Sequence, residues 1–187
     1  MTDWPVSWDG VAETITLTRT PVGDWNVAAL GVRAGVPATA RTWGATNTRE
    51  HFERTGGGRV GFPDDPVLFV EAALSERTVE APALDGLAAA VSVSVESIDR
   101  GRTGGTEWVE WALEPTAVRI DRRRVPITNR GFNAVVEMTV AASRLDVPTY
   151  DDATLRERLS FFADVVESAG GEREREALDR LRDLVSF

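Results

Sequence analysis

The sequence predicts an antiparallel β-barrel followed by a helical C-terminal segment. Up to about residue 130, short apolar runs alternate with turn signals, which is typical of β-strands. The connections within the first 43 residues are too short to hold crossover helices, so neighbouring strands should run antiparallel. Beyond residue 130, apolar residues recur at helical spacing. We therefore expect a barrel core over residues 1–130 and C-terminal helices over residues 131–187 that pack on the barrel.

The strands follow from alternation and from the turns between them. The first strand alternates β-branched and polar residues, and Pro21 to Asp24 turn the chain into the second. Gly35 and Pro37 break the chain again before the third strand. The expected strands, in chain order, are residues 11–18, 25–32, 38–43, 59–62, 88–98 and 106–118.

The helices are indicated by caps and by apolar spacing. Thr46 or Thr48 can cap a helix that runs to Thr55, and three glycines follow as a stop. A second short helix is expected after Pro66, through about Leu74. The C-terminal helices are expected at residues 132–145, 151–169 and 172–185, the last two forming an αα-hairpin.

Composition excludes several classes of function. Thirty acidic residues face 21 basic ones, every basic residue is Arg, and a net charge of -9 disfavours binding to nucleic acid or anionic lipid. The chain has no Cys, which excludes disulfides and thiolate chemistry. It shows neither a signal peptide nor an apolar run long enough to span a membrane, so a cytoplasmic location is expected. The Arg-only, acidic composition resembles that of proteins from salt-loving organisms, and we expect the fold to loosen at low salt.

The first candidate site lies where the third strand runs into a helix. Thr46, Asn47 and Thr48 place hydroxyls and an amide at the helix start, whose unpaired N–H groups suit a phosphate. Arg41 and Arg49 would add charge and bidentate donors. The alternative interpretation is an ordinary capping cluster with solvated arginines.

Two further segments are candidates for ligand contact. The second strand carries Asn26 followed by small residues and Gly31, which would let a planar ligand lie close to the backbone; the alternative is a strand that another element crosses tightly. Near residue 130, Asn129 or Asn133 can cap the next helix, or Arg130 can turn toward an anionic ligand.

The chain resembles an uncharacterised archaeal family in four segments that follow one another in the same order: the second strand, residues 41–52, residues 64–69 and residues 129–131. Members of that family adopt the FMN-binding split-barrel fold and are distantly related to flavin reductases. The similarity spans nearly the whole chain, including the C-terminal helices. It rests on the combination of segments, because no single motif is specific.

The resemblance implies a flavin site and a homodimer. Asn26, Val27 and Ala28 match the strand that lines the isoalloxazine ring in split-barrel flavoproteins. Asn47 and its neighbours match the segment that holds the phosphate, and the flavin lies near a subunit boundary. The residues expected at the FMN are Asn26, Val27, Ala28, Arg41, Thr42, Trp43, Thr46, Asn47, Thr48, Arg49, Asn129 and Arg130.

The function that follows is FMN binding, with a flavin-dependent oxidoreductase acting on an unknown small molecule as the leading hypothesis. A flavin or small-molecule binding module without turnover is the alternative, and a barrel that has lost its ligand is a third. His51, the only histidine, is either a structural residue or an acid–base group beside the flavin. A single histidine without cysteines predicts no metal site. The choice between FMN and a deazaflavin stays open.

Overall fold

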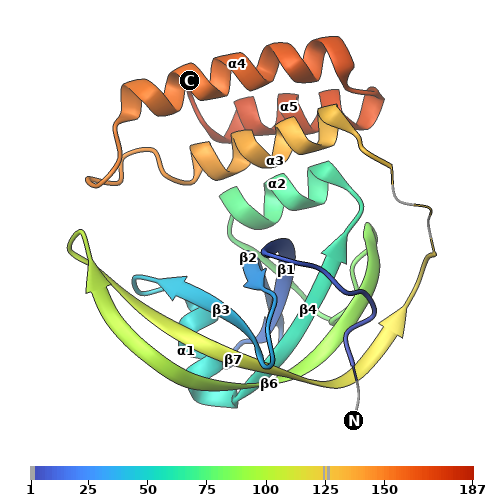
Figure 1. Ribbon diagram of the computed structural model, residues 1–187, viewed down its shortest axis with the longest axis vertical. Coiled ribbons are helices and arrows are strands. Elements are labelled where there is room, and N and C mark those ends of the chain that lie inside the picture. Colours follow the sequence, from blue (N-terminus) through green and yellow to red (C-terminus); the bar gives the residue numbers. More distant parts are fainter. Residues whose placement is uncertain (1–2, 124, 126) are drawn as a thin grey trace. The chain divides into compact units, whose positions relative to one another are not determined.

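A computed structural model describes residues 3–123, 125 and 127–187, which form two compact units (Figure 1). The first unit comprises residues 1–64 and 76–123, and the second comprises residues 65–75 and 124–187. The helix at Pro66–Leu74 therefore groups with the C-terminal helices, although it lies between two strands of the first unit.

The first unit is a six-stranded antiparallel barrel with one short additional strand. The sheet order is β1-β4-β6-β7-β3-β2, and pairing of β1 with β2 closes the ring. β6 and β7 form a long curved hairpin (Figure 1). The strands are β1 Val11–Arg19, β2 Trp25–Arg33, β3 Ala38–Trp43, β4 Gly57–Pro63, β5 Arg77–Val79, β6 Leu87–Thr103 and β7 Thr106–Ile120. This is the barrel expected from the sequence, with β5 as an addition.

Alternation along the strands builds the barrel core. Residues paired directly across antiparallel strands share a face, so the register aligns Val32 with Ala40 and Ala40 with Trp111 on the inner side. The core also contains Phe52, from the helix α1 (Asn47–Thr55). Its ring meets Trp111 edge to face at a centroid distance of 5.3 Å. Helix α1 is thereby tied into the barrel interior by its apolar side.

Strand β2 is the place where the ring of strands opens. On one edge it pairs with β1 along its whole length. On the other edge it pairs with β5 through Trp25–Val27 and with β3 only through Val32 and Arg33. Residues 28–31 lie between these two pairings, and no described strand pairs with them on that edge. Beyond residue 40, β3 continues alongside β7 alone, so β2 and β3 diverge.

The second unit is a four-helix assembly. Its helices are α2 Pro66–Leu74, α3 Arg130–Ala142, α4 Asp152–Ala169 and α5 Glu172–Leu184. They share one apolar core, in which Met138, Leu159 and Leu181 are fully buried. The Nε of Arg173 in α5 donates a hydrogen bond to Asp65, the N-cap of α2, at 2.9 Å, and Arg180 lies 3.4 Å from Glu71. Ion pairs and apolar packing therefore both join α2 to α5.

None of the helices in the described ranges is long and apolar enough to cross a membrane.

Candidate functional site

The divergence of β2 and β3 places the first two candidate segments on either side of one gap in the strand pairing, which is called the β2–β3 opening below. The unpaired stretch of β2 forms one side, and the end of β3 forms the other. β3 ends at Trp43, and after a left-handed turn at Gly44 the chain enters α1. The predicted ring segment and the predicted phosphate segment thus border the same opening.

The start of α1 is capped as the sequence indicated. The Thr46 side chain accepts a hydrogen bond from the Arg49 N–H at 3.3 Å, and its carbonyl accepts from the Glu50 N–H at 3.1 Å. The N–H groups of Asn47 and Thr48 bond to none of the described groups. Asn47 is exposed, whereas the side chain of Thr48 is buried. The first turn therefore keeps the donors that an anion would need.

Both candidate arginines are already held by carboxylates. Arg41 lies 3.0 Å from Glu110, and its guanidinium stacks on the Trp108 ring at 3.9 Å. Arg49 lies 3.3 Å from Glu53 and 3.6 Å from Glu107. Arg49 also donates to the Gly44 carbonyl at 3.3 Å, which fixes it beside the turn. An anion at this site would compete with these carboxylates.

Thr42 and Trp43 lie on opposite faces of β3. The Thr42 hydroxyl is inside the barrel, where it accepts a hydrogen bond from the Trp111 indole at 3.0 Å, and the residue is 4 % exposed. Trp43 is on the outer face, 45 % exposed, with the Arg41 guanidinium 5.7 Å from its ring. Trp43 is accessible to a ligand, and Thr42 supports the barrel from within.

The side chains of the predicted ring segment also point to two different faces of β2. The Asn26 side chain points into the barrel and is 6 % exposed, because Asn26 pairs with Thr18 on the inner side. Val27 is buried on the other face. Ala28 is the first residue of the unpaired stretch and is partly exposed, as is Ala29. The accessible part of this segment is therefore the backbone edge with its small side chains.

Asn129 and Arg130 belong to the helical unit. Asn129 is the N-cap of α3: its side chain accepts from the Phe132 N–H at 3.2 Å and donates to Glu174 at 2.8 Å. Arg130 is exposed on the first turn of α3. The next residue is Gly131, where a Cβ would lie 2.6 Å from the Gly170 Cα, so the close approach of these two backbones requires glycine. Asn129 has a structural role whether or not a ligand approaches Arg130.

His51 is buried on the inner side of α1. Its Nδ1 lies 2.9 Å from the Thr18 hydroxyl, and the residue is 5 % exposed. Burial, and secondarily the charge of Arg54, lower the pKa of His51, while Glu50 opposes this shift. The imidazole is therefore neutral at pH 7.

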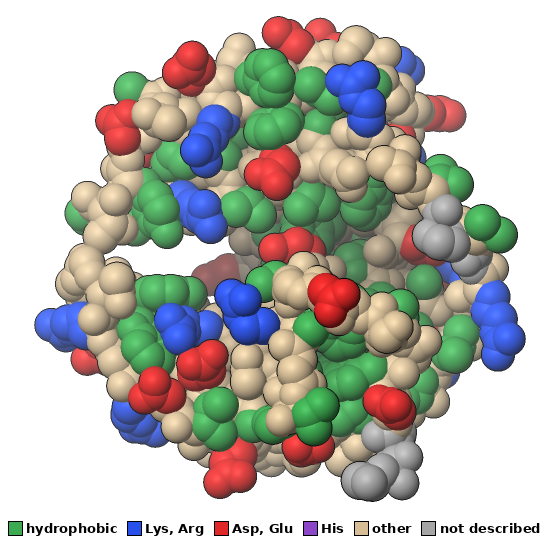
Figure 2. Space-filling model, in the orientation of Figure 1, with side chains coloured by type: hydrophobic (Ala, Val, Ile, Leu, Met, Phe, Trp, Pro, Cys, Tyr) green, Lys and Arg blue, Asp and Glu red, His purple; other side chains and the backbone are tan. Residues whose placement is uncertain are grey.

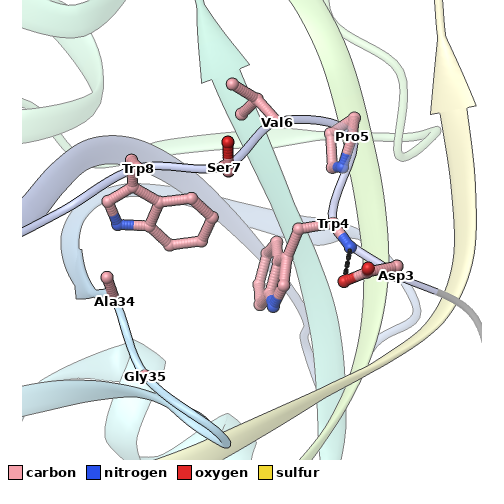
Figure 3. A pocket seen from close by; sticks show the side chains of 8 residues that line it. All are labelled: Asp3, Trp4, Pro5, Val6, Ser7, Trp8, Ala34 and Gly35. Atoms are coloured by element: carbon pink, nitrogen blue, oxygen red, sulfur yellow. Dashed lines mark hydrogen bonds between the residues drawn. The ribbon is translucent and has the colours of Figure 1, made fainter.

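A separate hollow of about 280 Å³ lies beside the N-terminal segment (Figure 3). The rings of Trp4 and Trp8 line it, and Ala34 and Gly35 close its other side. The Trp8 indole donates to the Val32 carbonyl at 3.2 Å, so this segment is anchored to β2. None of the residues predicted from sequence lies in this hollow.

Sequence reasoning missed the carboxylates and Trp108 around the two arginines. Glu107, Trp108 and Glu110 lie on β7 and reach β3 only through the register that pairs Trp43 with Trp108 and Arg41 with Glu110. The available signal was the alternation of Trp108 and Glu110 on one face of β7, but that pattern does not identify the neighbouring strand.

Family models for a protein of unknown function match both parts of the chain. The model of the DUF447 N-terminal domain matches residues 12–122, and a further DUF447 model matches residues 129–183. An FMN-bound protein from Methanosarcina mazei, assigned to the same family model, superposes with a TM-score of 0.81 at 22 % identity. The superposition covers 95 % of this chain and 96 % of that one, and it shows that the fold is the split barrel with C-terminal helices.

Two further flavin proteins resemble the chain less closely. The flavin reductase of the styrene monooxygenase from Pseudomonas putida has a TM-score of 0.43 at 13 % identity, over 63 % of this chain and 93 % of that one. Flavoredoxin from Methanosarcina acetivorans has a TM-score of 0.43 at 12 % identity, over 67 % of this chain and 79 % of that one.

Proposed function

We propose that this chain, which belongs to the DUF447 family, binds FMN at the opening between β2 and β3. The observation that carries the proposal is the unpaired edge of β2 facing the end of β3, from which the chain enters the capped start of α1. The two sides of this opening are thus an unpaired backbone edge and a helix N-terminus, which is suited to an anion. An FMN-bound protein of the same family and fold supports the choice of ligand.

The phosphate would lie at the first turn of α1. Asn47 and Thr48 offer backbone N–H groups there, and the Asn47 side chain is exposed. Arg49 is held beside Gly44 and would exchange a carboxylate for the phosphate. Arg41 lies on the preceding strand and adds a second positive charge. Thr46 would act indirectly, because its side chain caps the helix.

The isoalloxazine ring would lie along residues 28–31 of β2. Ala28, Ala29 and Gly31 leave the backbone accessible, and backbone N–H and C=O groups can bond to the polar edge of a flavin. Exposed Trp43 on the facing strand is suited to contact a planar ligand. Val27 would support the ring segment from behind, since its own side chain is buried.

Bound FMN would supply electron or hydride transfer, and the protein would supply orientation and electrostatics. This division suits a site in which His51, the only imidazole, is buried and neutral. The proposed activity is an oxidoreductase acting on a small molecule. A flavin carrier without turnover is the second candidate, since a buried His51 offers no exposed imidazole for acid–base catalysis and so fits a carrier as well as an enzyme. Reduction of bound FMN by NADH or NADPH would support the enzyme and count against the carrier.

The binding test compares three ligands on purified protein. FMN should bind and stay bound through desalting, whereas riboflavin, which lacks the phosphate, should bind more weakly. An Arg49→Ala variant should lose the preference for FMN over riboflavin while it keeps its melting temperature. A deazaflavin phosphate in place of FMN tests the identity of the ring. Protein that is colourless as purified and binds none of these ligands would overturn the proposal.

We also propose that the protein is a homodimer in which Arg130 of one subunit reaches the flavin of the other. Arg130 is exposed on the first turn of α3 and so is accessible to a second subunit. The mass in solution, with and without FMN, tests the dimer. An Arg130→Ala variant that binds FMN as the wild type does would exclude the contact.

A further inference from the structure

A row of polar side chains runs through the interior of the barrel along β1. Thr14, Thr16 and Thr18 occupy alternate positions, and all three are fully buried. The Thr14 hydroxyl donates to the Leu30 carbonyl at 2.5 Å, and Thr18 bonds to His51. The row therefore ends on the only histidine of the chain.

Two atoms of this region stand out because they are buried without a partner. Neither the Thr16 Oγ1 atom nor the Asn26 Nδ2 atom forms a hydrogen bond within the described part of the chain. Thr16 is fully buried and Asn26 is 6 % exposed. Buried polar groups in folded proteins are almost always satisfied by protein or by an ordered water, so two neighbouring exceptions indicate a bound group.

The strand register defines the space between these two atoms. Asn26 is directly opposite Thr18, and Thr16 is its diagonal neighbour on the same face. The Cα atoms of diagonal neighbours in an antiparallel pair lie about 7 to 8 Å apart, which is too far for a direct hydrogen bond between two short side chains. A single water molecule can bridge side chains at such a separation, and Thr18, directly opposite Asn26, would lie beside it.

The chemistry of the four groups then sets a direction. A hydroxyl and a water can each donate and accept, whereas the Nδ2 of an amide only donates. In the proposed arrangement the water accepts from Asn26 Nδ2 and from the Thr16 hydroxyl, neither of which has another partner in the described part of the chain. Both acceptor positions of the water are then occupied, so it donates to the Thr18 oxygen, and the Thr18 hydroxyl donates to His51 Nδ1. In that direction Nδ1 accepts, so the proton of the neutral ring must be on Nε2.

We propose that the barrel interior binds a water molecule between Thr16 and Asn26, and that Asn26, through this water and Thr18, keeps the proton of His51 on Nε2. Asn26 is a positioning residue in this proposal, because it acts on His51 through intermediates. The assignment does not depend on flavin binding.

The charged groups around His51 allow the effect to be separated from simple electrostatics. Arg54 and Glu50 lie on its own helix, while β1 and β2 present the neutral groups of Thr18 and Asn26. Asn47, one turn before His51, is exposed. An Asn26→Asp change replaces the donor by an acceptor inside the barrel, and Asn47→Asp adds the same charge outside it.

The test is the nitrogen-15 NMR spectrum of the single imidazole, recorded from pH 5 to 9 on the flavin-free protein. Wild type should show the Nε2–H tautomer. In Asn26→Asp the chain should reverse, so that Nδ1 carries a proton and the pKa of His51 rises above its ordinary value. Asn47→Asp should keep the Nε2–H tautomer.

A second variant covers the case in which Asn26→Asp does not fold. Asn26→Leu removes the fixed donor without adding charge, and a mixture of both tautomers is expected. An Nε2–H signal unchanged in the folded Asn26 variants would overturn the proposal. A high-resolution crystal structure without water between Thr16 and Asn26 would also overturn it.

Discussion

Replacing Glu107 by Gln should strengthen FMN binding, although the residue would not contact the ligand. Glu107 lies 3.6 Å from the Arg49 guanidinium, which is proposed to receive the phosphate. A phosphate must displace this carboxylate or share the arginine with it. Gln is similar in size but carries no charge, so it removes the competitor and leaves the strand intact.

The size of the effect follows from the distance and the exposure. Two unit charges 3.6 Å apart attract each other by about 1 kcal/mol in water. The Glu107 side chain is 56 % exposed, so solvent and salt reduce this value. We expect about 0.5 to 1 kcal/mol, a two- to five-fold lower Kd for FMN.

The assay is quenching of flavin fluorescence on titration of FMN with protein, at low and at molar salt. Glu114→Gln is the matched control: Glu114 is exposed on the same strand, and no ion pair to it is seen within the described ranges. It should leave the Kd within the error of wild type. The gain from Glu107→Gln should shrink at molar salt, where screening acts over about 3 Å. Unchanged or weaker binding by Glu107→Gln at low salt would refute the placement of the phosphate at Arg49.

Three other predictions concern stability. Gly131→Ala should destabilise the helical unit by about 1 to 3 kcal/mol, because the new Cβ would lie 2.6 Å from the Gly170 Cα; equal denaturant midpoints would contradict this. Because the folded-state pKa of His51 is lowered, the unfolded chain binds the proton first, and the free energy of unfolding should fall as the pH drops below about 6.5. His51→Gln should flatten that part of the pH profile, and an unaltered slope would assign it to other groups. The melting temperature should rise from dilute to molar salt, since 30 carboxylates repel one another less when screened; a constant value would count against adaptation to salt.

The surface distribution of charge bears on the last of these predictions. Figure 2 shows acidic and arginine side chains interspersed on the visible face. Several are paired: Arg182 lies 2.8 Å from Glu167, and Arg102 lies 3.3 Å from Glu107. Pairs of this kind weaken in salt while the repulsion among the excess carboxylates also falls. The direction of the salt effect therefore reports which of the two contributions is larger.

Local patterns predicted the regular strands, and they failed where glycines serve close packing. Gly57 and Gly58 follow the helix stop in sequence, yet they open β4. A Cβ on Gly57 would lie 2.9 Å from the Val93 carbonyl oxygen, and one on Gly58 would lie 3.0 Å from that of Leu17. Both glycines therefore allow close contact between neighbouring strands, and such a contact between distant segments cannot be predicted from the local sequence.

The full length of the β6–β7 hairpin was also not predicted, because the pairing near its turn has no local sequence pattern. Arg100 to Thr103 lie outside the expected strands, but they continue β6 and pair with Thr106 to Val109 of β7. Apart from the buried Val109, these residues are exposed or partly exposed, so no apolar alternation marks them as a strand. The actual turn is Gly104–Gly105, whose φ angles of 56° and 86° suit glycine. β5 has only three residues, too few for a pattern to emerge.

For the candidate site, the family resemblance assigned residues 26–28 and residues 41–49 to one flavin, and the structure has these segments on neighbouring strands and the helix that follows. The faces to which the individual side chains point were not predicted. Thr42 has the same parity along β3 as the buried Ala38 and Ala40, so an interior position was available from alternation alone. The partners of Arg41 and Arg49 were not available, because they depend on the register between β3 and β7.

The grouping of α2 with the C-terminal helices has a consequence for dissecting the protein. The chain leaves the barrel unit at Asp64, contributes a helix to the other unit, and returns at Glu76. No single cut therefore separates the two units. A fragment ending at Arg123 would retain α2 without α3 and α5, and would present Val67 and Val70 of that helix to solvent. Such a fragment should aggregate, whereas one in which residues 65–75 are replaced by a short polar linker would report on the barrel alone.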